Sequence, residues 1–150
     1  MSSTFPPQPS PQDAIDRLNA GNRRFVEGSC EHPRQDGRRR AELLAGQQPF
    51  AVVLTCADSR VVPEIVFDQG LGDLFVVRNA GNIVDYTVLA SVEYAVDHLR
   101  TPLVLVLGHS DCGAVTAVAR GEAAGGHLPC LARAIQPAVT KGQTAGGDVM

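Results

Sequence analysis

The chain has 150 residues, about the length of one domain, of which 44% are hydrophobic and 19% charged. Thirteen basic and sixteen acidic residues give a formal net charge of −3, which argues against nucleic acid or an anionic membrane as a partner. No apolar run approaches the roughly 18 residues of a membrane span, and the first 11 residues lack the basic and apolar blocks of a secretory signal. We therefore expect a cytoplasmic protein, in which the four cysteines suit metal binding or catalysis better than disulfides.

The amino-terminal part of the sequence predicts a tail followed by two helices. Residues 1–10 are expected to be a disordered tail, and residues 11–150 a single domain. A Ser-Pro-Gln-Asp sequence at residues 10–13 is typical of a helix start, and apolar residues at helical spacing extend this helix to about Phe25. A second, short helix is predicted over residues 38–44. The basic run inside it lacks interleaved aromatic residues, so we interpret it as a solvated helix face or an intersubunit pairing surface.

The rest of the chain alternates strands and helices. Three apolar, β-branched runs predict strands: residues 51–55, 74–77 and 103–107. These runs are apolar on both faces, which favours strands covered by helices on each side. A helix over residues 85–99 separates the last two, so the sequence predicts a parallel α/β sheet. A final helix is predicted over residues 128–139, with Pro137 disturbing its last turn.

Candidate metal ligands follow two of these strands. Cys56 ends the first strand, and His109 and Cys112 follow the third. Ligands of open parallel sheets bind beyond the carboxyl ends of the strands, so the two segments can face one crevice. Two thiolates and one imidazole are a donor set that zinc favours, and three protein ligands leave the fourth tetrahedral position open to water, as in catalytic zinc sites.

The charge of this donor set gives a role to two neighbouring residues. Two thiolates cancel the formal charge of the metal, so this zinc acidifies water less than a zinc held by three neutral histidines. Asp58 lies two residues after Cys56 and can accept a hydrogen bond from that water. Arg60 can keep Asp58 ionised, and away from the metal, through a bidentate contact.

The sequence resembles the β-class carbonic anhydrases, zinc enzymes that interconvert carbon dioxide and bicarbonate. The resemblance rests on the sequences CADSR at residues 56–60, RNAGN at residues 78–82 and HSDCGA at residues 109–114, and it runs from about Ala14 to about Val139. Carried over by position, it implies the following site residues: Cys56, His109 and Cys112 as zinc ligands, with Asp58 and Arg60 as the catalytic dyad. It also implies the family's α/β fold, a parallel-core sheet flanked by helices, here without the C-terminal strand and helices.

Two further positions match the family less specifically. Gln47 has the spacing at which many members place a glutamine that hydrogen-bonds substrate across a dimer interface, although a plain surface glutamine before Pro49 explains it equally well. Gly81 matches a position where the backbone packs close to the active site, and it also suits a tight turn. Both are kept as candidate substrate-binding residues.

The sequence therefore predicts reversible, zinc-dependent hydration of carbon dioxide to bicarbonate and a proton, by a homodimer or higher homo-oligomer without a nucleic-acid or membrane partner. Two alternatives stay open. One is a carbonyl sulfide or carbon disulfide hydrolase on the same scaffold, which a substrate panel would identify. The other is a truncated, inactive zinc-binding remnant, which would carry zinc without turnover.

Overall fold

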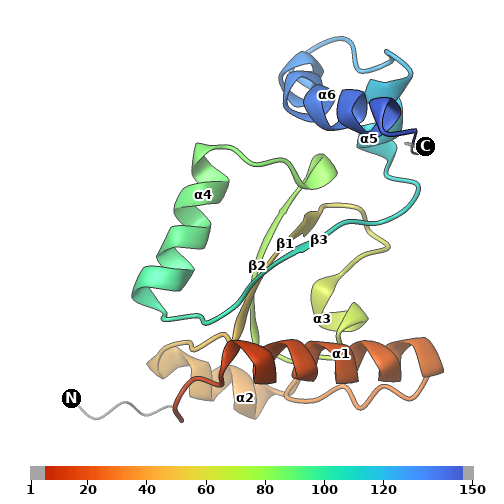
Figure 1. The fold of residues 1–150 in the computed structure, drawn as a ribbon. Coiled ribbons are helices and arrows are strands. Elements are labelled where there is room, and N and C mark those ends of the chain that lie inside the picture. Colours follow the sequence, from red (N-terminus) through yellow and green to blue (C-terminus); the bar gives the residue numbers. More distant parts are fainter. Residues whose placement is uncertain (1–5, 147–150) are drawn as a thin grey trace.

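A three-stranded parallel sheet forms the centre of the protein (Figure 1). The computed structural model describes residues 6–146. Strand β1 (Ala51–Cys56) lies between β2 (Leu74–Asn79) and β3 (Val104–Leu107), in the order β2-β1-β3. All six residues of β1 pair with β2, from Ala51 with Leu74 to Cys56 with Asn79. The predicted parallel α/β architecture is confirmed.

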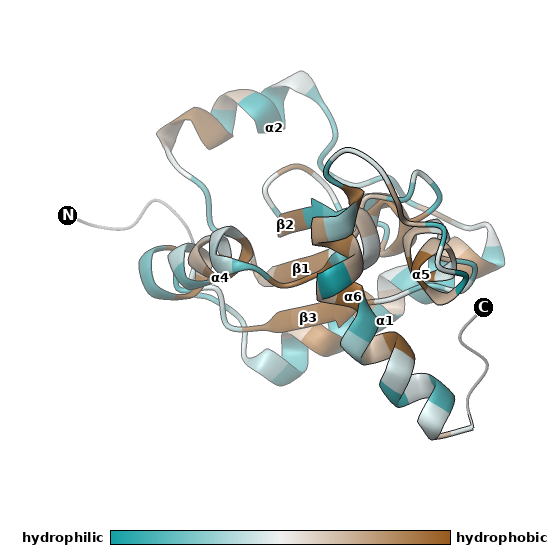
Figure 2. Ribbon diagram, turned by 90° about the horizontal axis from the view of Figure 1, so that it is seen from above, coloured by the Kyte–Doolittle hydropathy of each residue, from teal (hydrophilic) through white to brown (hydrophobic). Residues whose placement is uncertain are grey.

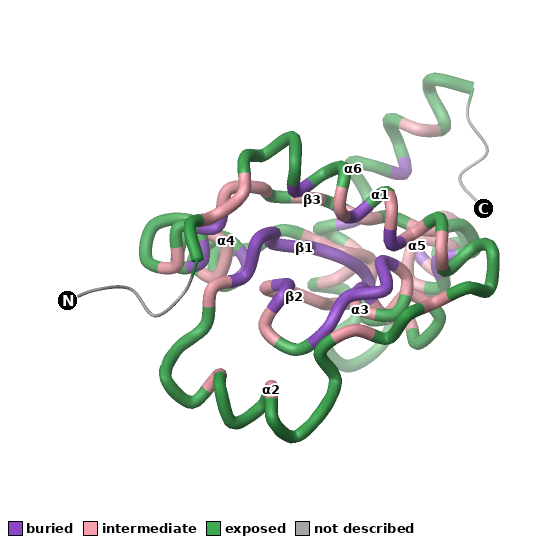
Figure 3. The backbone as a smooth tube through the Cα atoms, turned by 90° about the horizontal axis from the view of Figure 1, so that it is seen from below, coloured by how far each residue is buried: buried purple, intermediate pink, exposed green. Residues whose placement is uncertain are grey.

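The three strands differ in how well they are covered. Every residue of β1 is buried, as Figure 3 shows in purple along its length. Strand β3 is as hydrophobic as β1 (Figure 2), yet Val104 and Val106 are 44% and 60% exposed. The expectation of helices on both faces is therefore wrong for β3. Val104 shares the face of Phe75, and the helix on that face covers the β2 side, where Tyr94 lies 6.3 Å from Phe75 between ring centroids.

Helix α1 (Pro11–Glu27) covers the opposite face of the sheet, together with the short helix α3 (Pro63–Val66). Ser10 caps α1 by accepting from the Asp13 N–H, and the Asp13 carboxylate accepts from the Ser10 N–H, so the predicted start is confirmed. The buried face of α1 consists of Ala14, Leu18 and Gly21. Phe25 was expected to continue this face but is 39% exposed, because α1 extends past the sheet in its last turns.

The other predicted helices form, with changes at their ends. Helix α2 (Gly37–Glu42) continues as a 3₁₀ turn (Leu43–Ala45), and α4 (Tyr86–Glu93) continues as a π-helical turn (Tyr94–His98). Asp85 caps α4 through the Thr87 and Val88 N–H groups.

The helices α5 (Gly113–Ala119) and α6 (Leu128–Thr144) form a hairpin beyond the carboxyl ends of the strands (Figure 1). The prediction that α6 ends near Val139 is wrong, since the helix continues through Pro137. Ile135 and Val139 flank Pro137 and are both buried in the apolar cluster between α5 and α6. This packing keeps both halves of α6 in place although Pro137 cannot donate a backbone hydrogen bond.

Parts of the predicted organisation fall outside the described residues. These parts are residues 1–5 of the expected tail and residues 147–150 of the expected domain, so the domain division stays a prediction. Within the rest of the tail, Gln8 donates from Nε2 to the Pro49 carbonyl at 3.1 Å. Among residues 6–146, no helix combines the length and the apolar character needed to cross a membrane.

Candidate metal centre

The three predicted metal ligands lie together at the carboxyl end of the sheet. Cys56 is the last residue of β1, and the loop between β3 and α5 carries His109 and Cys112. Because β1 and β3 are adjacent and parallel, the two segments leave the sheet side by side. The ligand atoms of the three residues all lie within 4.8 Å of one another, and within residues 6–146 no other three His, Cys, Asp or Glu side chains cluster this way.

The geometry of this trio fits a tetrahedral ion. The two Sγ atoms of Cys56 and Cys112 are 3.9 Å apart, far longer than a disulfide bond. Two sulfurs bound at about 2.3 Å to one ion at the tetrahedral angle lie about 3.8 Å apart. The trio can therefore accept zinc without a large rearrangement of the sulfurs.

The His109 ring is held in the orientation that a metal ligand needs. Its Nδ1 lies 2.8 Å from the Ser110 carbonyl, to which it donates when the ring is neutral. Its Nε2 is buried and has no hydrogen-bond partner within residues 6–146. A buried nitrogen with a free lone pair is costly unless a ligand completes it, so Nε2 points to a bound cation.

The surroundings of Cys56 favour its thiolate. Burial raises the pKa of the Cys56 thiol, but the neighbouring His109 ring, the Asp58 and Gly81 N–H groups and the Cys112 thiol together outweigh burial and lower the pKa to about 7. The Cys56 thiolate in turn is the main cause that raises the pKa of His109, although burial opposes it. Thiolate formation near neutral pH is what binding of a soft divalent cation requires.

Gly81 contributes its backbone N–H, which lies 3.3 Å from the Cys56 sulfur. It belongs to a short turn (Ala80–Asn82) after β2 and adopts a φ of 70°, in the left-handed region that glycine tolerates best. A Cβ at this position would lie 2.7 Å from Cδ1 of Ile135 in α6. Gly81 therefore touches a candidate ligand, as its predicted place near the site requires.

Asp58 and Arg60 form the predicted pair next to the trio. Arg60 donates from Nε to Oδ1 and from Nη2 to Oδ2 of Asp58, both at 2.9 Å. These hydrogen bonds hold the pKa of the Asp58 carboxyl well below its usual range. Arg60 also donates to the Asp111 carbonyl at 2.9 Å, so it links the loop after β1 to the loop that carries His109 and Cys112.

Gln47 does not join this group within the chain. It is exposed and precedes the amino end of β1, whereas Cys56 ends the same strand. A role for Gln47 at a metal centre therefore requires a second copy of the chain.

Arg78 is a site residue whose role the sequence did not reveal. It lies in β2 and donates from Nε to the Cys56 carbonyl at 3.0 Å and from Nη2 to the Asp58 carbonyl at 2.7 Å. Arg78 thus fixes the backbone on both sides of residue 57. The only signal in the sequence was a charged residue directly after an apolar strand, within the RNAGN motif.

Comparisons with known proteins agree with this arrangement. A family model described as carbonic anhydrase matches residues 51–149. "Carbonic anhydrase 2" of Mycobacterium tuberculosis is 49% identical over 144 residues, which cover 93% of this chain and 70% of that protein.

Solved structures show the same likeness. The β-carbonic anhydrase CafA of Aspergillus fumigatus matches with a TM-score of 0.65 and 29% identity, over 87% of this chain and 62% of that one. A structure from a study of two tetrameric β-carbonic anhydrases of Sordaria macrospora matches with a TM-score of 0.67 and 25% identity, over 89% and 68%. The chain thus spans about two thirds of these relatives.

Proposed function

Because this chain belongs to the β-carbonic anhydrase family, we propose that it catalyses the reversible hydration of carbon dioxide to bicarbonate and a proton. The observation that carries the proposal is the convergence of Cys56, His109 and Cys112 next to the Asp58–Arg60 pair. Neither a carbonyl sulfide or carbon disulfide hydrolase nor an inactive remnant has an observation in its favour that hydration lacks.

The two cysteines and the histidine would hold a zinc ion. When bound, zinc supplies a Lewis acid that makes a water molecule nucleophilic near neutral pH. The chain's own contribution starts with the three ligands. Hydrogen bonds to Cys56 favour its thiolate, and the Ser110 carbonyl holds Nδ1 of His109, which leaves Nε2 to bind the ion.

Asp58 would orient the attacking water. Its carboxylate stays ionised at neutral pH because Arg60 stabilises the charged form, so it can accept a hydrogen bond but cannot donate one. This acceptor directs a lone pair of the water toward carbon dioxide. Because two thiolates neutralise a divalent cation, a nearby carboxylate acceptor matters more here than at a site with three neutral ligands.

Arg60 would restrain Asp58 rather than touch the substrate. Its two contacts occupy the edge of the carboxylate that would otherwise be free to turn onto the cation. Its third contact, to the Asp111 carbonyl, holds the Asp58–Arg60 pair next to the loop that carries His109 and Cys112. Arg78 supports the same geometry from β2 by holding the Cys56 and Asp58 carbonyls.

We also propose that the protein works as a homodimer or higher homo-oligomer in the cytoplasm, with Gln47 of one copy reaching the substrate in another. The exposed position of Gln47 and the uncovered apolar side chains Val104 and Val106 support an assembly. The free cysteines of the metal centre support a reducing compartment.

The Asp58→Ala variant tests the proposed function. We expect it to bind zinc as the unmodified protein does and to lose most of its carbon dioxide hydration activity, because the ligands stay in place while the acceptor is removed. Asp16→Ala, at an exposed position of α1, is the matched control and should keep full activity. Unchanged stopped-flow hydration rates in Asp58→Ala would show that the pair has no catalytic role.

A further inference from the structure

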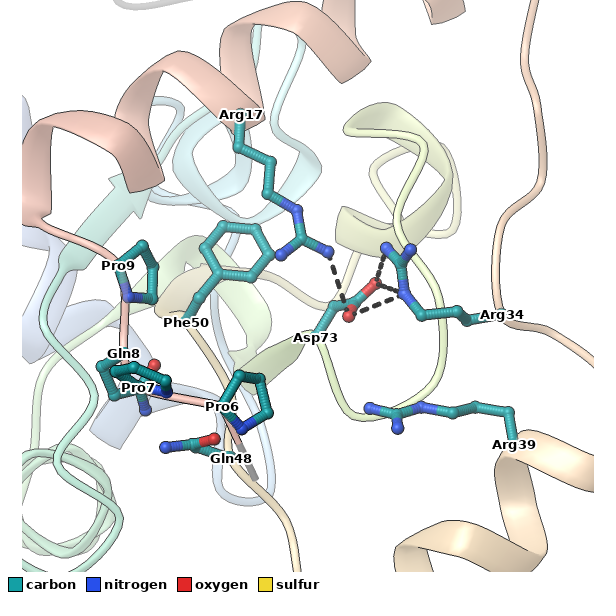
Figure 4. A pocket seen from close by; sticks show the side chains of 10 residues that line it. All are labelled: Pro6, Pro7, Gln8, Pro9, Arg17, Arg34, Arg39, Gln48, Phe50 and Asp73. Atoms are coloured by element: carbon teal, nitrogen blue, oxygen red, sulfur yellow. Dashed lines mark hydrogen bonds and ion pairs between the residues drawn. The ribbon is translucent and has the colours of Figure 1, made fainter. Parts of the chain in front are cut away.

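A polar cavity lies at the amino end of the sheet, away from Cys56. Its volume is about 430 Å³, within the range of small-molecule sites. Arginines from three segments line it: Arg17 from α1, Arg34 from the loop before α2, and Arg39 from α2 (Figure 4). We call it the arginine cavity. The proposed hydration of carbon dioxide gives this cavity no role.

One carboxylate holds two of the three arginines in place. Asp73 is 6% exposed, and its Oδ1 lies 3.1 Å from Nη2 of Arg17. Arg34 donates from Nε to both Asp73 oxygens at 3.0 Å, and the Gly70 N–H donates to Oδ2 at 2.8 Å. The hydrogen-bonding capacity of Asp73 is thus used up by residues of this chain.

The third arginine has no carboxylate inside the cavity. Arg39 donates from Nε to the Leu71 carbonyl at 3.1 Å, and its Nη1 lies 3.4 Å from Glu42, which does not line the cavity. Within residues 6–146, Nη2 of Arg39 and Nη1 of both Arg17 and Arg34 have no hydrogen-bond partner. Three guanidinium groups therefore face one carboxylate in the cavity, and each keeps a donor that has no partner among residues 6–146.

The arginines lie close enough to influence one another. Burial, the largest effect, lowers the pKa of Arg17, the charges of Arg34 and Arg39 lower it as well, and Asp73 opposes them, with a net decrease. The residues that line the cavity carry a formal charge of +2, of which Glu42 beside Arg39 offsets a part, so the cavity favours an anion.

The rest of the lining combines apolar rings with two amides. Pro6, Pro7 and Pro9 come from the segment before α1, Gln8 and Gln48 lie among them, and the Phe50 ring lies 4.1 Å from the Arg17 guanidinium carbon. Figure 4 shows the proline side chains across the cavity from the arginines. An occupant that uses both walls needs a charged end and an organic end.

We propose that the arginine cavity binds a small phosphate monoester. Guanidinium groups match phosphate oxygens through paired N–H donors, and donors from three directions suit a tetrahedral dianion better than a planar carboxylate. The organic group of the ester packs against the prolines and Phe50. This binding involves no residue of the metal centre and is independent of the proposed reaction.

The test is calorimetric titration of the zinc-loaded protein with inorganic phosphate and with phenyl phosphate at constant ionic strength. The Arg39→Gln variant removes the arginine with the fewest contacts to the fold, and Arg38→Gln is the control, because Arg38 is 86% exposed and does not line the cavity. We expect the unmodified protein and Arg38→Gln to bind one equivalent of phosphate. The affinity of Arg39→Gln for phosphate should be lower by about tenfold or more. Phenyl phosphate should bind more tightly than inorganic phosphate.

Several results would overturn the proposal. If the unmodified protein shows no saturable phosphate binding, the site does not exist. If Arg39→Gln binds phosphate as tightly as Arg38→Gln, phosphate binds elsewhere, for example at the metal centre. If phenyl phosphate binds no more tightly than inorganic phosphate, the prolines and Phe50 do not bind the organic group, and the proposal of a phosphate monoester is wrong. Should Arg39→Gln fail to fold, phenylglyoxal labelling of the unmodified protein decides: phosphate should protect Arg39 but not Arg38, and equal labelling would contradict the site.

Discussion

The two ends of the sheet use polar side chains in opposite ways. At the carboxyl end, a ring nitrogen of His109 and the sulfurs of Cys56 and Cys112 lie within 4.8 Å of one another, and the buried Nε2 has no hydrogen-bond partner among residues 6–146. At the amino end, the buried carboxylates of Asp68 and Asp73 are saturated by arginines and backbone N–H groups of the same chain.

The difference shows which buried polar groups hold the fold and which await a ligand. The Asp68 and Asp73 carboxylates tie the segment before α2 to the start of β2, a structural task that residues 6–146 complete among themselves. The trio at the other end has unused ligand atoms in a buried place, which the fold alone does not explain. If this distinction is correct, substitutions at the two ends should change different properties.

The largest effect on stability is expected at the amino end. Asp73→Asn leaves Arg17 and Arg34 without their common carboxylate, which we expect to reduce the free energy of unfolding by about 2 kcal/mol, less than for a fully buried pair because both arginines are partly exposed. Zinc binding should not change. Urea unfolding measures the loss, with Asp16→Asn on the surface of α1 as the control. A weaker zinc affinity in Asp73→Asn would mean that the two ends are coupled.

A smaller effect, on zinc affinity rather than on stability, is expected at the carboxyl end. Arg78→Lys cannot donate to the Cys56 and Asp58 carbonyls at once, so the backbone around Cys56 is held less firmly. We expect zinc affinity to fall about tenfold, as for other residues that orient metal ligands. Competition with a chelating dye measures it, and Arg23→Lys, at an exposed position of α1, serves as the control. Equal zinc affinity in both variants would remove Arg78 from the site.

The smallest effect depends on pH and concerns Asp68. Burial raises the pKa of Asp68, but hydrogen bonds from the Glu31 and His32 N–H groups and from Arg24 lower it by more than burial raises it. The stability that Asp68 provides is therefore complete above its unfolded pKa of about 3.9 and is lost as the pH falls through the lower, folded value. The difference in melting temperature between the unmodified protein and Asp68→Asn should thus shrink between pH 5 and pH 3. A constant difference would show that the carboxylate charge is not what stabilises this end.

The sequence was sufficient where topology alone decides the outcome. Cys56 and His109 are far apart in the chain, yet both follow apolar strands, and the parallel arrangement of β1 and β3 brings their loops together. The start of α1 was equally predictable, because the Ser10–Asp13 capping box is local. Both inferences need only short-range patterns and the rule that parallel strands end at one edge.

What the sequence missed depends on long-range side-chain contacts. The two carbonyls that Arg78 reaches, and the pairing of Arg34 with Asp73, involve residues that no spacing rule relates. The exposure of Val106 depends on how far α4 extends across the sheet, and the continuation of α6 through Pro137 depends on packing against α5. In each case tertiary contacts override or supplement a local preference.

The most direct test measures zinc in protein purified under reducing conditions, together with its X-ray absorption spectrum. We expect one zinc per chain, with two sulfur neighbours at about 2.3 Å and at least one nitrogen neighbour from imidazole. A metal-free protein that takes up no zinc on addition, or one in which Cys56 and Cys112 are joined in a disulfide, would contradict the account.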